Sequence, residues 1–156
     1  SWDRCADALR ECAEFGAGHG IVVSLQNHNH LQIAPDGEDV LRLMDQVGHP
    51  NLGHVLDTGQ YAGSPGASGF ADDTLREQHD YLASVRLTAP RATYVRAKLY
   101  RISTGVEEWL DYDQIFSVLR RVEYNGWVSL VYEGEDDALD VIPLGVRFLR
   151  GYLSAS

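Results

Sequence analysis

The chain has 156 residues, 44% of them hydrophobic and 10% aromatic, which fits one globular domain over residues 1–156 with an apolar core. Its formal net charge is −10, and its Lys and Arg residues are scattered along the chain. Binding to nucleic acid or to an anionic membrane needs clustered basic residues, so we expect neither as a partner. No apolar run reaches the roughly 20 residues that span a bilayer.

The first expected helix runs from Trp2 to Phe15, with apolar residues at helical spacing, and a run of glycines ends it. Cys5 and Cys12 would lie about 10 Å apart along this helix, too far for a disulfide. We therefore expect two packed, reduced thiols, as in a cytoplasmic protein. The apolar run from Ile21 to Leu25 predicts a strand that is buried on both faces.

The next unit is a helix followed by a strand. Asp36 is placed to cap a helix with apolar residues between Val40 and Val47, which a Gly-His-Pro-Asn turn ends. Leu52 to Leu56 is the second expected strand, and it closes on Asp57.

A long glycine-rich loop, TGQYAGSPGASGF, follows this strand. It contains no phosphate-binding glycine motif, so nucleotide binding is not indicated, and its length suits a lid or a disordered segment. After it we expect a helix that opens at Asp72 and Asp73 and includes Leu75, His79 and Val85.

Three more elements and a final helix complete the prediction. They are a strand from Thr93 to Leu99, a helix from about Asp113 to Val122, a strand from Trp127 to Tyr132 and a helix from Leu139 to Leu153. Because helices and strands alternate without a hairpin signal, we predict an α/β fold with a parallel sheet and right-handed crossovers.

Polar residues gather where the expected strands end, at Gln26 to His30, Asp57 to Gln60, Lys98 and Glu133. In parallel α/β folds, binding sites form at the carboxyl ends of the strands. The sequence therefore predicts a site at this end of the sheet.

Four motifs in this order, LQNH, HPNLGHVLDTGQ, YVRAKLY and YNGWVSLVYEGEDD, resemble the xylose isomerase-like TIM barrels. This superfamily includes sugar and sugar-phosphate isomerases and epimerases, inosose dehydratases and abasic-site endonucleases. The resemblance covers nearly the whole chain and corresponds to strands five to eight, which makes the chain a half-barrel. It implies a divalent metal held by four residues at the strand ends.

The resemblance places the four metal ligands at Gln26, Asp57, Arg96 and Val131, where the relatives have Glu, Asp, His and Glu. Only Asp57 is retained. Gln26 offers a neutral carbonyl oxygen, Val131 offers no ligand, and Arg96 brings a fixed positive charge. In the epimerase members the two glutamates also move the proton, so their loss removes the family's acid and base.

These substitutions suggest that an Asp57–Arg96 ion pair takes the former metal position. Removing Arg96 alone would then cost about 3–5 kcal/mol if the pair is deeply buried. No cofactor is expected in that case, and a small sugar or polyol would be bound by residues at the strand ends, namely Gln26, His28, Gln60, Arg96 and Lys98.

A rebuilt site is the alternative. Asp57, His28, His30 and His54 could hold Mn, Mg or Zn, with His28 and Lys98 as candidate catalytic residues. Strand alternation opposes this in part, because His54 lies three residues from Asp57 and faces the other side of the strand. For His28 an ordinary loop role, with a hydrogen bond to a neighbouring carbonyl, is favoured over a ligand role. For Lys98 a site role and a structural ion pair are equally open.

Three other features have structural interpretations beside functional ones. Trp109 and Trp127 could line a sugar pocket, although aromatic residues beside strands and helices usually belong to the core. The EGEDD segment, Glu133 to Asp137, is more typical of a solvated acidic loop that caps the last helix than of a cation site.

Two interpretations of function follow. In the first, the chain is a non-catalytic or mechanistically altered relative that binds a small sugar or polyol. In the second, it is an active isomerase, epimerase or lyase with a rebuilt metal site that uses Asp57 and His28. A complete barrel takes about 250 residues, so we expect a fragment of a larger protein, or a half-barrel that pairs with a second copy or a partner half-barrel.

Overall fold

The computed structural model describes residues 2–29, 33–66 and 79–154. Their elements are α1 (Trp2–Gly18), β1 (Val23–Gln26), α2 (Gly37–Val47), β2 (Leu52–Asp57), α4 (Tyr81–Thr88), a 3-10 turn (Ala89–Arg91), β3 (Ala92–Leu99), α5 (Tyr112–Arg121), β4 (Trp127–Tyr132) and α6 (Ala138–Leu153). The four strands form one parallel sheet in the order β1-β2-β3-β4. The predicted α/β fold is confirmed.

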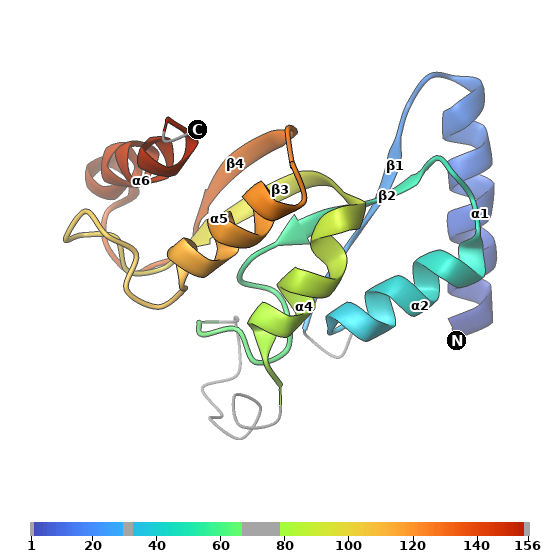
Figure 1. Ribbon diagram of the computed structural model, residues 1–156, viewed down its shortest axis with the longest axis horizontal. Helices are drawn as coiled ribbons and strands as arrows, with labels where there is room; N and C mark the ends of the chain where they lie inside the picture. The colour runs from blue at the N-terminus through green and yellow to red at the C-terminus, as the bar shows by residue number, and fades with distance from the viewer. Residues whose placement is uncertain (1, 30–32, 67–78, 155–156) are drawn as a thin grey trace.

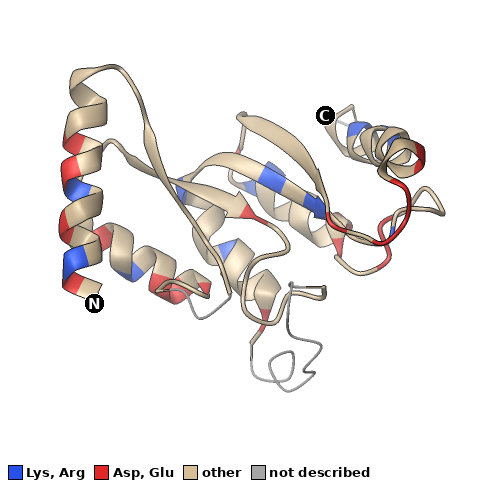
Figure 2. Ribbon diagram, turned by 180° about the vertical axis from the view of Figure 1, so that it is seen from behind, with Lys and Arg blue, Asp and Glu red and all other residues tan. Residues whose placement is uncertain are grey.

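The helices α2, α4 and α5 lie in front of the sheet in Figure 1, and the view from behind in Figure 2 looks onto strands that no helix crosses. Two groups of buried apolar residues fill the space between helices and sheet. One joins α1 and α2 to the first strands, and the other joins α4, α5 and α6 to the remaining strands. The sheet therefore has one packed face and one open face, as in a barrel cut along its axis.

The edge strand β1 differs from the sequence-based expectation. It begins at Val23, and the preceding Ile21 and Val22 each keep 58% of their surface exposed. All four residues of β1 are only partly buried. The prediction of a strand buried on both faces was wrong, because β1 lies at the edge of the sheet and one of its faces is uncovered.

Helix capping follows the sequence closely. Asp36 accepts a hydrogen bond from the backbone N–H of Asp39, and Gly48 ends α2 in the left-handed conformation. The Asp137 carboxylate accepts from Leu139 N–H at the start of α6, so the acidic segment does cap the last helix.

Helix α4 does not include all the residues predicted for the helix before β3. It begins at Tyr81, because Asp80 caps it by accepting from the N–H of Leu82, so His79 lies outside it. The predicted start at Asp72 and Asp73 lies outside the described residues.

Two further expectations about packing were wrong. Trp109 is 41% exposed and Trp127 is 80% exposed, so neither indole belongs to the core. Cys12 is exposed, whereas Cys5 is half-buried.

None of the helices in residues 2–29, 33–66 and 79–154 is long and apolar enough to cross a membrane.

His54 is a fully buried imidazole on β2, and its hydrogen bonds tie the sheet to α4. Its Nδ1 lies 2.8 Å from the carbonyl oxygen of Leu25, and its Nε2 lies 2.8 Å from the hydroxyl of Tyr61, which in turn bonds Thr88. Burial lowers the pKa of His54 from 6.5 to about 4. The ring therefore stays neutral at physiological pH.

This shift predicts a pH dependence of stability. Between pH 6.5 and 4 the unfolded chain binds a proton at His54 that the folded chain does not, so stability falls as the pH is lowered through this window. His54→Asn keeps a donor for Leu25 and removes the titrating ring. We expect the loss of unfolding free energy between pH 7 and 4 to be about 3 kcal/mol smaller in the variant. Equal losses in urea denaturation series would contradict this assignment.

Candidate functional site

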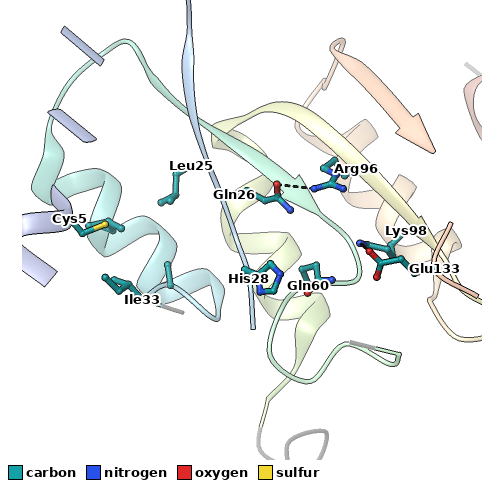
Figure 3. Close-up of a pocket in the computed structure, with 11 residues that line it drawn as sticks. Cys5, Leu25, Gln26, His28, Ile33, Gln60, Arg96, Lys98 and Glu133 are labelled. Atoms are coloured by element: carbon teal, nitrogen blue, oxygen red, sulfur yellow. Dashed lines mark hydrogen bonds and ion pairs between the residues drawn. The ribbon is translucent and has the colours of Figure 1, made fainter. Parts of the chain in front are cut away.

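A cavity of about 610 Å³ opens at the carboxyl ends of β1, β2, β3 and β4. Its polar wall consists of Gln26, His28, Gln60, Arg96, Lys98 and Glu133. Its opposite wall is apolar and includes Leu25 and Ile33 (Figure 3). The cavity thus brings together all five residues that were predicted to bind substrate, together with Glu133.

Asp57, at the end of β2, is fully buried and contacts three residues of this polar wall. Its Oδ2 lies 3.6 Å from Nε of Arg96 and 3.6 Å from Nζ of Lys98, and it accepts a hydrogen bond of 3.2 Å from Nε2 of Gln26. Its Oδ1 accepts a bond of 3.1 Å from the N–H of Gly59. The ion pair predicted between Asp57 and Arg96 is therefore present.

Two opposing effects set the charge of Asp57. Burial raises the pKa of this carboxyl, while Lys98, the N–H of Gly59 and Arg96 lower it. Burial is the largest effect, so the pKa lies above the usual value of 3.8. The nearby cations and hydrogen-bond donors offset the free-energy cost of burying this carboxylate.

Gln26 joins the two charges instead of binding a metal. Its Oε1 accepts a 2.9 Å hydrogen bond from Nη1 of Arg96, and its Nε2 donates to Asp57 (Figure 3). A glutamate at this position would place a second carboxylate against Asp57. The neutral amide suits this position because one end can face a guanidinium and the other a carboxylate.

Lys98 is the second cation, and the sequence did not predict its pairing with Asp57. Only 1% of its surface is exposed, and its Nζ lies 2.6 Å from Oε1 of Glu133 as well as 3.6 Å from Asp57. Counting Asp57 and Glu133 as −1 each, and Arg96 and Lys98 as +1 each, gives a balanced group. The site is thus neutral without a metal.

The backbone around Asp57 is fixed by side chains that sequence reasoning missed. Asn27 donates to the carbonyl oxygen of Asp57 and accepts from its N–H, at 3.0 and 2.9 Å. Thr58 accepts from the N–H of Lys98, at 2.9 Å. A side chain at Gly59 would meet Cγ of Lys98 at 2.6 Å, so glycine lets Lys98 lie close. The only sequence signal was the position of these residues beside strand ends.

The residues present do not fit the divalent metal that the resemblance implies. Of the four family positions, only Asp57 offers an anionic oxygen, and Arg96 holds its guanidinium 3.6 Å from that oxygen. Mg²⁺ and Mn²⁺ prefer several carboxylates, whereas a guanidinium repels them. The described part of the chain contains no group of three or more His, Cys, Asp and Glu side chains that could hold a metal ion.

The rebuilt metal site also lacks support from His54. Its two ring nitrogens bond Leu25 and Tyr61, away from Asp57. His28 does line the cavity, and His30 lies outside the described residues. Of the four residues considered for a rebuilt site, Asp57 and His28 therefore remain as candidate ligands.

The sequence is similar to a known protein family and to a curated relative. The family model for the xylose isomerase-like TIM barrel matches residues 1–152. Inosose dehydratase from Glaesserella parasuis serovar 5 (strain SH0165) is 28% identical over 148 residues, which cover 87% of this chain and 48% of the relative.

Solved structures agree on the fold. D-allulose 3-epimerase from Methylomonas sp. in complex with D-allulose has a TM-score of 0.72 at 18% identity, over 97% of this chain and 55% of that chain. The probable 3-DHS dehydratase AsbF from Bacillus anthracis has a TM-score of 0.68 at 18% identity, over 93% and 55%. The chain thus spans about half the length of the relatives it matches, and these structures establish the fold alone.

The pairing of Lys98 with Asp57 predicts coupled effects on stability. Lys98→Met keeps the length of the side chain and removes its charge, so it should lower the unfolding free energy by about 3 kcal/mol. In an Asp57→Asn background the same change should cost at least about 1 kcal/mol less, because the buried carboxylate is gone.

Urea denaturation of the two single variants and the double variant measures this coupling. Arg91→Met is the matched control, since Arg91 pairs with Asp45 at the surface, at 3.3 Å, and should cost less than about 1 kcal/mol. Strictly additive effects of the Lys98 and Asp57 changes would contradict the pairing.

Proposed function

This chain belongs to the xylose isomerase-like TIM barrel family, and we propose that it binds a small sugar or polyol without the family's divalent metal, as a non-catalytic or mechanistically altered relative. The observation that supports this proposal is the contact of Arg96 and Lys98 with one buried carboxylate oxygen of Asp57, each at 3.6 Å. Two fixed cations there supply the charge that a metal would otherwise supply.

The cavity has the chemistry that a sugar requires. A sugar presents hydroxyl groups at its edge and C–H groups on its faces, and the cavity offers a polar wall opposite an apolar wall. The Arg96 side chain is 32% exposed, so its guanidinium can donate to a ligand oxygen while its Nε stays near Asp57. His28 and Gln60 also line this cavity (Figure 3).

The groups that remain are better suited to binding than to proton transfer. Gln26 and Val131 cannot exchange a proton in the role of the family's two glutamates. The ammonium group of Lys98 lies between Glu133 and Asp57, so in this arrangement it donates rather than accepts. His28 and the carboxylate of Glu133 are the groups lining this cavity that could act as an acid or base.

The second candidate function is an active isomerase, epimerase or lyase with a metal site rebuilt from Asp57 and His28. Both residues belong to the same end of the sheet, which favours this alternative. It would require Arg96 and Lys98 to move away from Asp57 when the metal binds. The two functions therefore differ in whether ligand binding needs a metal.

Isothermal titration with D-allulose, D-fructose, D-tagatose and myo-inositol tests the proposal. We expect at least one to bind, with the same affinity in Mn²⁺ and in EDTA. Arg96→Ala should weaken this binding about tenfold or more, because a charged donor is lost. Arg91→Ala removes a surface guanidinium and should change nothing. Binding that EDTA abolishes would favour the rebuilt metal site instead.

We also propose that a second half-barrel covers the open face of the sheet, either from a second copy or from a partner. Ile21 and Val22 beside β1 are 58% exposed, and Trp127 on β4 is 80% exposed. The parallel edges of β1 and β4 are both unpaired among the described residues. Open edges and apolar side chains at the same positions favour association.

Sedimentation velocity of the 156-residue chain tests this association. We expect the chain to form a dimer. In the Trp127→Glu variant the monomer–dimer equilibrium should shift toward the monomer, because a buried carboxylate would oppose contact at the open face. Leu87→Glu, at a 44% exposed position on α4, is the control and should not change the mass. A monomer at all concentrations would contradict pairing with a second copy.

A further inference from the structure

A second cavity, of about 740 Å³, lies beside the first. It is formed by the loops that follow β3 and β4, so it opens at the same end of the sheet. Glu133 lines both cavities, with its carboxylate held by Lys98. The proposed function makes no use of this second cavity.

The second cavity is built around an exposed aromatic ring. Trp109 is 41% exposed, and its ring lies 5.5 Å from that of Tyr100, centroid to centroid, at an angle of 34°. The guanidinium of Arg101 lies 5.9 Å from the Trp109 ring centroid. Ser103, Glu135 and Asp136 provide polar groups around this apolar surface. An aromatic face bordered by hydrogen-bonding groups suits a sugar ring.

The loop that carries Trp109 is fixed in place by one buried carboxylate. Glu107 is 5% exposed, and its Oε2 accepts from the N–H groups of Tyr100 and Arg101, at 2.8 and 3.1 Å. Its Oε1 accepts from the N–H of Trp109, at 3.1 Å. Three backbone donors on one carboxylate hold the indole in position before any ligand binds.

The loop that follows β4 is also fixed by local contacts. The hydroxyl of Tyr132 accepts from the N–H of Asp136, at 2.8 Å. A side chain at Gly134 would meet the carbonyl oxygen of Tyr100 at 2.0 Å, so only glycine lets the two loops approach. The cavity is therefore a formed feature of the strand ends and not a gap between loose segments.

Charge narrows the class of ligand. Glu135 and Asp136 bring two carboxylates to this cavity and Arg101 one guanidinium, while Glu133 is paired with Lys98 and Arg101 with Glu108. A phosphate group would meet repulsion here, whereas an uncharged ring with hydroxyl groups would meet both acceptors and a donor.

We infer that the second cavity binds a second sugar ring, so that the ligand is a disaccharide or glycoside whose first ring lies against Arg96 and whose second ring lies on Trp109. This inference rests on the proposed function, because the first ring takes the cavity already described. Glu133 lies at the junction of the two rings and can accept from a hydroxyl of either.

The experiment compares D-fructose with three disaccharides that contain it, sucrose, lactulose and isomaltulose, by isothermal titration. At least one disaccharide should bind about tenfold more tightly than D-fructose. Trp109→Ala should remove that advantage and leave D-fructose binding within about twofold, since the ring contributes only to the second cavity. Trp109→Phe should restore part of it. Trp127→Ala, at the opposite end of β4, is the matched control and should change neither affinity.

A second readout locates the ligand. The chain has three tryptophans, so a Trp2→Phe/Trp127→Phe variant reports from Trp109 alone. Its emission should shift with the bound disaccharide and not with D-fructose. Binding of D-fructose without any disaccharide advantage would overturn the two-ring inference and leave the proposed function standing. A tighter complex with D-fructose 6-phosphate than with every disaccharide would also overturn it, and failure of all sugars would overturn both.

Discussion

The carboxylate of Asp57 is fully buried, and the neighbouring side chains offset the cost of burying its negative charge. Arg96 and Lys98 both reach its Oδ2, and Gln26 and the N–H of Gly59 complete its contacts. An uncompensated carboxylate at this depth would cost several kcal/mol. Gln26 and Arg96, which stand at two of the expected ligand positions, therefore belong to one interacting group with Asp57 and Lys98.

This arrangement supports the proposal that the site binds its ligand without the family's metal. The amide of Gln26 faces a guanidinium with its oxygen and a carboxylate with its nitrogen. Lys98 likewise lies between Asp57 and Glu133. Under the proposed function, the family fold is kept while Arg96 and Lys98 supply the positive charge beside Asp57.

Much of the fold could be predicted from the sequence, because apolar runs, caps and turns are local signals. Asp36, Gly48 and Asp137 mark helix ends that the structure confirms. The Asp57–Arg96 pair was predicted because the family resemblance places both residues at metal-ligand positions. The pairing of Lys98 with Asp57, the support from Asn27 and the exposure of Trp109 and Trp127 could not be predicted, because they depend on how strands are staggered and on which face of the sheet stays uncovered.

The measurement that tests this account most directly is a Mn²⁺ titration of the metal-free chain beside a Gln26→Glu/Arg96→His/Val131→Glu variant, which returns the family's ligand types to all four positions. The account predicts no stoichiometric binding by the natural sequence and one bound ion per chain in the variant. Tight, stoichiometric Mn²⁺ binding by the natural sequence that Asp57→Ala abolishes would contradict it.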